Sequence, residues 1–370
     1  MQYNFCIMPL VDLLNRFMRV ELAAPRYLIP PSVGIDISAS GIKLAVVAER
    51  LDGLELVAFG EERLELGVVA STEPADRQKV AEAVRILAKK HHIHSASIAL
   101  SESRSYLFET DVPGKSRKEW RTAVEPHIDE FVPLPPQDTA FDIASTGSAG
   151  ELTHVVGVGY ASRVIEESLA TLDEAGVAVT AVESETFSLP RALLPSGNTD
   201  TVLIIDIGRT TTKLMIVEKR LPRFATTLEI GGHALTLAVV KHFGVSEEEA
   251  KRVKADKGLV GGPGNEEYLA AMLSTVSAIR EEIARRLDYW QTRAGEGTGR
   301  SLVTRAVLVG GNATVRGLPE YLETNLRIPV VLGDVFANLA SRDKWLPPID
   351  YMESLAYATA IGLALRNHDR

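Results

Sequence analysis

The stretch TVLIIDIGRTTTKLMIV, from Thr201 to Val217, has two apolar runs around a turn of glycine, arginine and threonine. Asp206 lies near the end of the first run, and Lys213 lies at the start of the second. Apolar runs of about four to eight residues, bounded by turn residues, are typical of buried strands. The stretch therefore predicts a β-hairpin whose turn carries polar side chains.

The same layout occurs earlier in the chain, in PSVGIDISASGIKLAVV from Pro31 to Val47. Without a gap, Asp36 aligns with Asp206 and Lys43 aligns with Lys213, an offset of 170 residues (206 − 36). Similarity at a fixed offset indicates a repeated structural unit. We therefore expect a duplicated fold with two related halves.

Each half continues in a similar order after its hairpin. Residues 53–66 alternate as a third strand, residues 76–92 have apolar side chains at helical spacing, and residues 95–103 hold a short buried strand. In the second half, helical patterns separate the hairpin from a strand, glycine turn, helix and strand at residues 305–333. This alternation predicts an α/β fold with two lobes.

Changes in composition and in the pattern of apolar residues suggest the domain boundaries. A proline-rich segment with its own strands and helix predicts an inserted α+β subdomain in the first half. The apolar stripe of the N-terminal extension is consistent with an amphipathic helix, either docked on the protein or lying on a membrane surface. The expected boundaries are 1–31 for the extension, 32–103 and 155–198 for the first lobe, 104–154 for the insertion, 199–230 and 301–370 for the second lobe, and 231–300 for a helical subdomain beside it.

Composition narrows the function classes. The chain has 370 residues, of which 45% are hydrophobic, and its net charge is −9. An acidic chain of this kind lacks the basic footprint of a nucleic-acid-binding protein. Its single cysteine, Cys6, cannot form an internal disulfide, which fits a reducing cytoplasm. No apolar stretch reaches the roughly 20 residues of a membrane-spanning helix.

The polar residues of the two hairpins suit the binding of a phosphate chain. Asp36 and Asp206 end their strands, where carboxylates can hold Mg²⁺ through water. The turns that follow, SASG and GRTTT, offer hydroxyl groups and backbone N–H groups to phosphate oxygens. Lys43 adds a cation beside the first turn. Two such turns facing each other would clamp one nucleotide, and VLVGGNATVRGL, Val307 to Leu318, offers paired glycines against which a base or ribose could lie.

These motifs, in this order, resemble the actin, Hsp70 and sugar-kinase superfamily, whose fold is actin-like and ribonuclease H-like. Three further segments narrow the resemblance to the PilM family of type IV pilus assembly proteins, which is FtsA-like. The segments are residues 125–143, 158–193 and 229–258, and the resemblance covers residues 32–365. It implies a bacterial, cytoplasmic protein at the periphery of the inner membrane that binds ATP and Mg²⁺ and hydrolyses ATP slowly at most.

The resemblance also implies roles for individual residues. Asp36 and Asp206 would lie at the Mg²⁺ ion, and Lys254 would contact the nucleoside. Glu185, or as a weaker alternative Glu183, would position the attacking water, with Asp206 as the other catalytic group. The phosphates would bind Ser38, Ser40, Lys43, Gly208, Thr210 and Thr211, and the adenosine would lie against Gly310, Gly311 and Asn312.

The partner that the resemblance implies is the short N-terminal tail of a PilN-like inner-membrane protein, with pilus motor ATPases and self-association as further contacts. The inserted subdomain is where relatives contact partners. Its segment EFVPLPP, Glu130 to Pro136, either docks a peptide or fills an internal gap.

Two residues depart from the family pattern. Ser38 stands where relatives usually have glycine, which predicts a looser first phosphate turn, and Lys251 stands where they often have glutamate, which weakens the expected ribose contact. Two other functions stay open at this point. One is an FtsA-like cell-division protein, and the other is a small-molecule kinase of the same superfamily, for which the sequence offers no separate catalytic aspartate.

Overall fold

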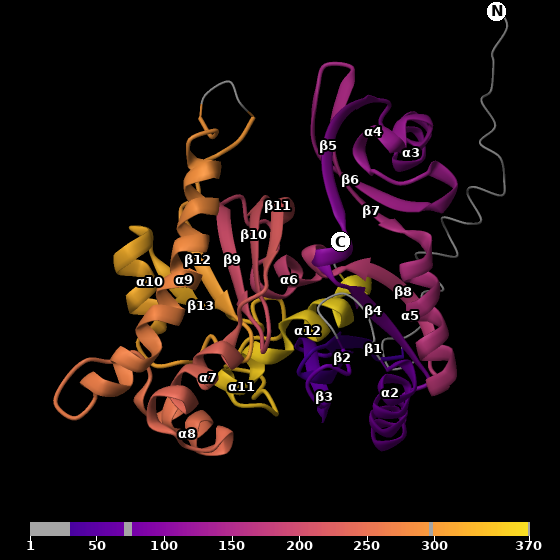
Figure 1. The fold of residues 1–370 in the computed structure, drawn as a ribbon. Helices are drawn as coiled ribbons and strands as arrows, with labels where there is room; N and C mark the ends of the chain where they lie inside the picture. The colour runs from indigo at the N-terminus through magenta and orange to yellow at the C-terminus, as the bar shows by residue number, and fades with distance from the viewer. Residues whose placement is uncertain (1–29, 70–75, 296–298, 369–370) are drawn as a thin grey trace, which may run out of the picture.

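The computed structural model describes residues 30–69, 76–295 and 299–368. The helix expected in the N-terminal extension falls on residues 1–29, outside these ranges. Two lobes lie side by side, and a smaller third unit lies against the first lobe (Figure 1). Within the described ranges, no helix is long and apolar enough to cross a bilayer.

The first lobe is built on a five-stranded sheet in the order β3-β2-β1-β4-β8. β1 and β2 form the expected hairpin, and β4 and β8 continue the sheet in parallel. α2 places Val80, Val84 and Leu87 at helical spacing against Ile35 and Leu44 of the sheet. The strands are β1 (Ser32–Ser38), β2 (Gly41–Arg50), β3 (Gly53–Arg63), β4 (Ser95–Leu100) and β8 (Ala178–Ser184), and the helices are α2 (Arg77–His91), α5 (Ser162–Ala175) and α6 (Glu185–Leu193).

The second lobe repeats this topology. Its sheet has the order β11-β10-β9-β12-β13, with an antiparallel hairpin followed by two parallel strands. Strand for strand, this matches the first sheet, which confirms the duplication predicted from the two hairpin sequences. The strands are β9 (Thr201–Ile207), β10 (Thr212–Glu218), β11 (Leu221–Leu228), β12 (Arg305–Val309) and β13 (Val330–Leu332).

Helices surround the second sheet and connect the lobes. α7, α8 and α9 pack together beside the sheet, and α12 crosses to the first lobe, where it contacts α6 and β1. The crossing is close at Gly362 of α12, where a Cβ would lie 2.0 Å from the Ser188 carbonyl oxygen. The helices are α7 (Gly232–Phe243), α8 (Glu247–Lys257), α9 (Glu266–Gln291), α10 (Leu318–Leu326), α11 (Tyr351–Ser354) and α12 (Ala358–Ala364).

The inserted unit has a three-stranded sheet in the order β5-β7-β6, covered by two short helices. We expected the first lobe to resume at residue 155, but that boundary falls inside β7, the central strand of the small sheet. Apolar periodicity identifies a strand without saying which sheet it joins. The lobe resumes at α5. The elements are β5 (Tyr106–Pro113), α3 (Arg117–Val124), α4 (Ile128–Phe131), β6 (Thr139–Ala149) and β7 (Leu152–Ala161).

The proline-rich segment of the insertion fills an internal gap. Val132 is fully buried, and the Phe131 ring stacks on Phe108 with 4.7 Å between centroids. Pro133 and Pro135 remain exposed on the outer side of the segment. Of the two interpretations left open by the sequence, the structure supports the internal one.

Candidate functional site

The two hairpins face each other across a cleft of about 400 Å³ between the lobes, within the usual range for small-molecule sites. In both hairpins the aspartate is paired in register with the lysine, Asp36 with Lys43 and Asp206 with Lys213. The structure thus brings together most of the predicted site residues, since the cleft is lined by Asp36, Ser38, Ser40, Lys43, Asp206, Gly208, Thr210, Thr211, Lys213, Gly310, Gly311 and Asn312.

The two aspartates have carboxyl groups that are poorly solvated. Burial raises the pKa of Asp36 to about 6, although Lys213 and Lys43 act in the opposite direction. Burial also raises the pKa of Asp206, again against the attraction of Lys213. Carboxylates held in this way are stabilised by a bound cation. Among the described residues, no three His, Cys, Asp or Glu side chains gather as a metal site, so a cation here would depend on phosphate and water for its other ligands.

The first turn is a small hydroxyl and ammonium cluster. The Lys43 Nζ donates to Ser40 Oγ at 2.7 Å and lies 3.5 Å from a Glu61 carboxylate oxygen. The Oγ atoms of Ser38 and Ser40 are 2.9 Å apart. Lys43 is only 6% exposed, so its ammonium is already positioned at the wall of the cleft.

The second turn is tied to the glycine pair. The Gly208 N–H donates to the Thr211 carbonyl at 2.9 Å, which closes the turn. Asn312 Nδ2 donates to the Gly208 carbonyl at 2.9 Å, and Asn312 Oδ1 accepts from Lys254 Nζ at 2.8 Å. Lys254 does not itself line the cleft, and burial lowers its pKa to about 8. Lys254 therefore contributes to the site through its hydrogen bond to Asn312.

Gly310 allows this loop to approach Asp206. Its φ is +94°, and a Cβ placed there would lie 2.2 Å from Asp206 Oδ1. Gly311 differs, since the nearest atom to a Cβ would be Ala356 Cβ at 3.8 Å, an ordinary contact. The first glycine is thus required by the fold, and the second leaves open space beside the cleft.

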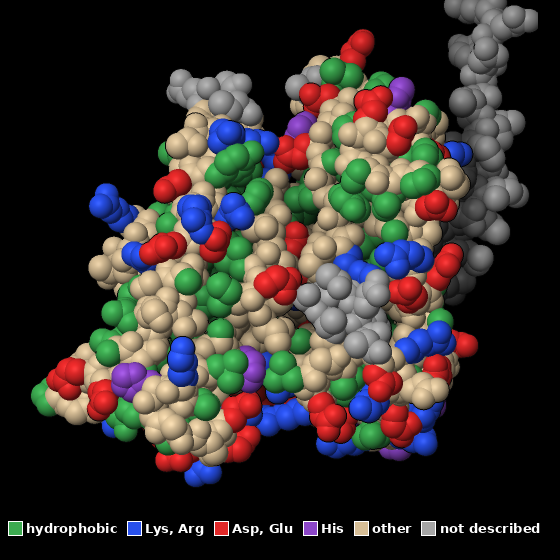
Figure 2. Space-filling view, in the orientation of Figure 1, with side chains coloured by type: hydrophobic (Ala, Val, Ile, Leu, Met, Phe, Trp, Pro, Cys, Tyr) green, Lys and Arg blue, Asp and Glu red, His purple; other side chains and the backbone are tan. Residues whose placement is uncertain are grey.

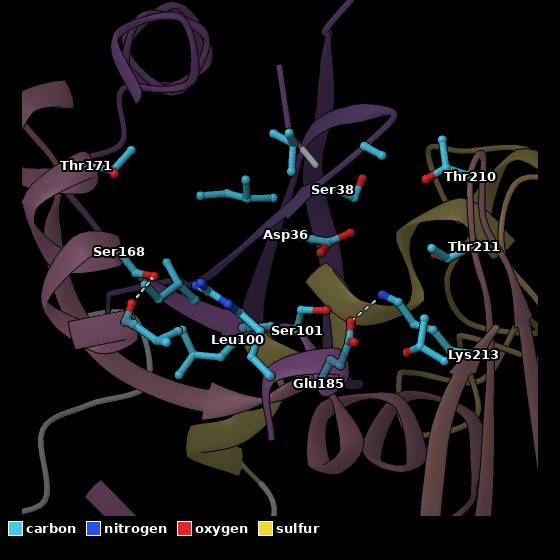
Figure 3. A pocket seen from close by; sticks show the side chains of 18 residues that line it. Asp36, Ser38, Leu100, Ser101, Ser168, Thr171, Glu185, Thr210, Thr211 and Lys213 are labelled. Carbon is cyan, nitrogen blue, oxygen red and sulfur yellow. Dashed lines mark hydrogen bonds and ion pairs between the residues drawn. The ribbon is translucent and has the colours of Figure 1, made fainter. Parts of the chain in front are cut away.

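Glu185 and Glu183, the two alternatives for a water-positioning residue, point into different hollows. Glu185 begins α6 and lines a cavity of about 110 Å³ that adjoins the cleft and shares Asp36 and Lys213 with it (Figure 3). Glu183 instead pairs with Arg191, at 2.5 Å, and with Arg366, at 3.2 Å. Of the two, only Glu185 lines a hollow that adjoins the cleft between the hairpins.

Neither Lys213 nor Glu102 has a role predicted from the sequence, but both contact Glu185. The Lys213 Nζ lies 2.5 Å from Glu185 Oε2, and the Glu102 N–H donates to Glu185 Oε1 at 2.6 Å. Burial alone would lower the pKa of Lys213, but the carboxylates of Glu185, Asp206 and Asp36 raise it overall. The alignment of Lys213 with Lys43 was a visible signal, whereas nothing local marks Glu102.

A second hollow of about 750 Å³ lies between the inserted unit and the first lobe, and we call it the insertion groove. Its walls combine apolar side chains with arginines, and Lys or Arg side chains are visible at this junction in Figure 2. Arg121 lies 4.6 Å from the Phe141 ring centroid, and Arg117 pairs with Asp142. The lining includes Leu100, Trp120, Phe141, Ile143, Val158, Ile165, Phe187 and Arg366.

Comparisons with known proteins agree with this architecture. A PilM–PilN type IV pilus biogenesis complex contains a chain that is 22% identical, with a TM-score of 0.75 over 92% of this chain and 99% of that one. The ethanolamine utilization protein EutJ from Carboxydothermus hydrogenoformans is 17% identical, with a TM-score of 0.56 over 96% of each chain. MreB5 of Spiroplasma citri, solved bound to ADP, is 13% identical, with a TM-score of 0.53 over 85% of this chain and 94% of that one.

These likenesses establish the actin-like fold, and the family model for type IV pilus assembly protein PilM matches residues 34–368. The chain therefore belongs to the PilM family of type IV pilus assembly proteins.

Proposed function

We propose that this chain is an ATP-binding scaffold of type IV pilus assembly. The observation that carries the proposal is the pair of facing hairpins, each with an aspartate in register with a lysine. One hairpin alone is a common element, whereas two that share a cleft provide opposed phosphate-binding turns. Gly310 also brings the loop after β12 close to Asp206, and only glycine leaves room for this approach.

The residues of the cleft fit Mg²⁺·ATP. Asp36 and Asp206 would hold Mg²⁺ through its water ligands, and their raised pKa values reflect carboxylates that lack sufficient solvation without a cation. A bound Mg²⁺ would neutralise charge on the phosphates. The turn residues Ser38, Ser40, Lys43, Gly208, Thr210 and Thr211 would bind the phosphates, and Gly310, Gly311 and Asn312 would line the adenosine, with Lys254 acting through Asn312.

The small cavity beside Glu185 favours a scaffold over a small-molecule kinase. Its volume of about 110 Å³ is well below the roughly 300 Å³ at the low end of small-molecule sites. A kinase must place a substrate hydroxyl group and a base on this side of the phosphate chain. The space beside Glu185 suits water and a terminal phosphate group. This supports a protein that binds the nucleotide without a second substrate.

The insertion groove is the proposed docking site for the N-terminal tail of a PilN-like inner-membrane protein. Five consecutive residues of β6, 140–144, line it, and β6 is an edge strand of the small sheet. An extended peptide can add to an edge strand, and the apolar wall offers pockets for its side chains. On β6 such a peptide would compete with Arg121, which donates to the Phe141 carbonyl, and with Asp142, whose Oδ1 accepts from the Ile143 N–H. Through such a tail the chain would dock at the cytoplasmic face of the inner membrane.

The tail site can be tested with a matched pair of variants on α5. Ile165 lines the groove, whereas Leu169, one turn later and 40% exposed, does not. We expect Ile165→Arg to weaken the binding of a fluorescent tail peptide at least tenfold, because a charge replaces an apolar contact. Leu169→Arg should bind like wild type. Equal binding by both variants would contradict the placement, and failure of wild type to bind would contradict the partner.

A further inference from the structure

The carboxylate of Glu185 is held between the two lobes. Lys213, on β10 of the second lobe, contacts its Oε2 at 2.5 Å, while Glu185 itself belongs to α6 on the side of the first lobe. Figure 3 shows the two side chains meeting across the cavity. Glu185 is 2% exposed, so this ion pair is largely shielded from water. It is a fixed link between the lobes at the bottom of the site.

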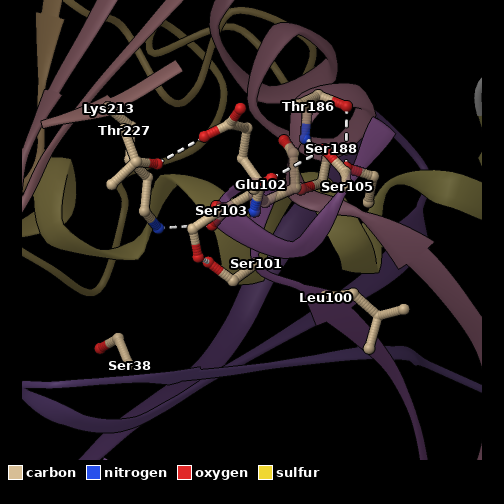
Figure 4. A network of polar contacts seen from close by, with 12 residues as sticks. Ser38, Leu100, Ser101, Glu102, Ser103, Ser105, Thr186, Ser188, Lys213 and Thr227 are labelled. Atoms are coloured by element: carbon tan, nitrogen blue, oxygen red, sulfur yellow. Dashed lines mark hydrogen bonds and ion pairs between the residues drawn. The ribbon is translucent and has the colours of Figure 1, made fainter. Parts of the chain in front are cut away.

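The other oxygen of the same carboxylate is also engaged. The Glu102 backbone N–H donates to Glu185 Oε1 at 2.6 Å, from the short 3₁₀ turn Glu102–Arg104 that follows β4. The Glu102 side chain in turn accepts a hydrogen bond from Thr227 Oγ1 of β11, across the lobes (Figure 4). Lys213 and Glu102 together therefore fix both oxygens of Glu185 with groups from opposite sides of the cleft.

This geometry restricts the part that Glu185 can take in hydrolysis, because its carboxylate is held in one orientation. In that reaction the water oxygen bonds to the γ-phosphorus while the bond from that phosphorus to the β–γ bridging oxygen breaks. ADP keeps that electron pair, and the water proton passes to the base and then to solvent. The base must turn an oxygen toward the water at hydrogen-bond distance. Each Glu185 oxygen keeps a second lone pair for a water that lies in reach of its present orientation. Any turn toward a water placed elsewhere would break the contact with Lys213 or with Glu102, inside a site where an unpaired charge is costly.

We propose that Lys213 is a positioning residue that holds Glu185 across the cleft, so that this carboxylate ties the lobes together instead of activating water. The inference rests on the proposed nucleotide site. Under it, the chain holds ATP with hydrolysis suppressed, and the scaffold stays in its nucleotide-bound form. If Lys213 instead bound the γ-phosphate, removing its charge would lower the affinity for ATP. If Lys213 only holds Glu185, the affinity should stay close to that of wild type.

The first test uses the nucleotide-free protein and hydrogen exchange read by mass spectrometry. Lys213→Met removes the ammonium, which frees Glu185 and weakens the Glu102 N–H contact, so residues 101–105 should exchange at least about tenfold faster. Lys213→Arg keeps the cation and should restore slow exchange. Lys241→Met, at an exposed position on α7, is the matched control and should change nothing. Unchanged exchange in Lys213→Met overturns the proposal.

The second test adds ATP·Mg²⁺ to the same variants. Lys213→Met should bind with a dissociation constant within about threefold of wild type and should hydrolyse ATP at least about fivefold faster. The gain should vanish when Glu185→Gln is added. A tenfold loss of affinity, or an unchanged rate, overturns the proposal. If Lys213→Met does not fold, Glu185→Gln probes the same pair, and it too should speed exchange at residues 101–105.

The two failures can be told apart. Wild type that does not bind ATP·Mg²⁺ refutes the proposed function, and with it the suppression of hydrolysis. The exchange measurement, made without nucleotide, still decides whether Lys213 positions Glu185.

Discussion

The two glycines after β12 provide a sharp test, because they are adjacent in sequence and differ in what they contact. Gly310 has φ +94°, and a Cβ there would lie 2.2 Å from Asp206 Oδ1 and 2.7 Å from the Ile207 carbonyl oxygen. Gly311 has no positive φ, and a Cβ there would meet only Ala356 Cβ, at 3.8 Å. We predict that Gly310→Ala is strongly destabilising and that Gly311→Ala is not.

The magnitude follows from two terms. An L-residue with a positive φ costs about 1–2 kcal/mol. Forcing a methyl group into a filled space costs about 1–3 kcal/mol more. The sum is about 2–5 kcal/mol, which lowers the unfolding temperature by roughly 5–15 °C for the second lobe with its helices, residues 199–370, unfolding as one unit. Since the displaced group is the Asp206 carboxylate, affinity for ATP·Mg²⁺ should fall with stability.

The assay is thermal unfolding without nucleotide, followed by ATP·Mg²⁺ titration of whichever variants remain folded. Gly311→Ala should unfold within about 2 °C of wild type, because its methyl group enters open space. If Gly310→Ala unfolds at the wild-type temperature, the loop does not approach Asp206 as described. If both variants are equally destabilised, the difference between the two glycines is wrong.

Three further predictions concern the cleft and the crossing helices. Lys43→Ala should weaken ATP·Mg²⁺ binding roughly 30-fold in a calorimetric titration, because a charge-assisted contact contributes about 2 kcal/mol; an unchanged affinity would place the phosphates elsewhere. Burial raises the pKa of Asp36 from 3.8 to about 6, so the protein loses stability as the pH rises through this interval, and the loss is complete above about pH 6. Asp36→Asn should therefore raise the unfolding temperature of nucleotide-free protein at pH 7.5, by an amount that shrinks toward pH 5, and a lowered unfolding temperature at pH 7.5 would reverse the sign of this argument. Gly362→Ala should destabilise the protein, since its methyl group would meet the Ser188 carbonyl at 2.0 Å, and a wild-type circular dichroism melt would contradict the close crossing of α6 and α12.

The duplicated hairpins could be predicted because they are local. Their strands, turn residues and aspartate–lysine register all lie within 17 residues, and the structure confirms the pairing of Asp36 with Lys43 and of Asp206 with Lys213.

Features that depend on distant segments could not be predicted. The apolar run of β7 identifies a strand but not its sheet, so the insertion boundary was placed too early. The link from Lys213 to Glu185 joins two lobes, and the support that Lys254 gives Asn312 joins α8 to the loop after β12. The insertion groove likewise forms only when α5, α6 and β6 come together. Neither the composition nor the spacing of these residues carries that information.

The central claim is that the cleft between the two hairpins is a nucleotide site. The most direct measurement is calorimetric titration of ATP·Mg²⁺ into wild-type protein and into the Asp36→Asn, Asp206→Asn double variant. We predict one binding event per chain for wild type and at least a hundredfold loss for the double variant, because both Mg²⁺-side carboxylates are gone. No binding by wild type, or equal binding by the double variant, would contradict the assignment of this cleft.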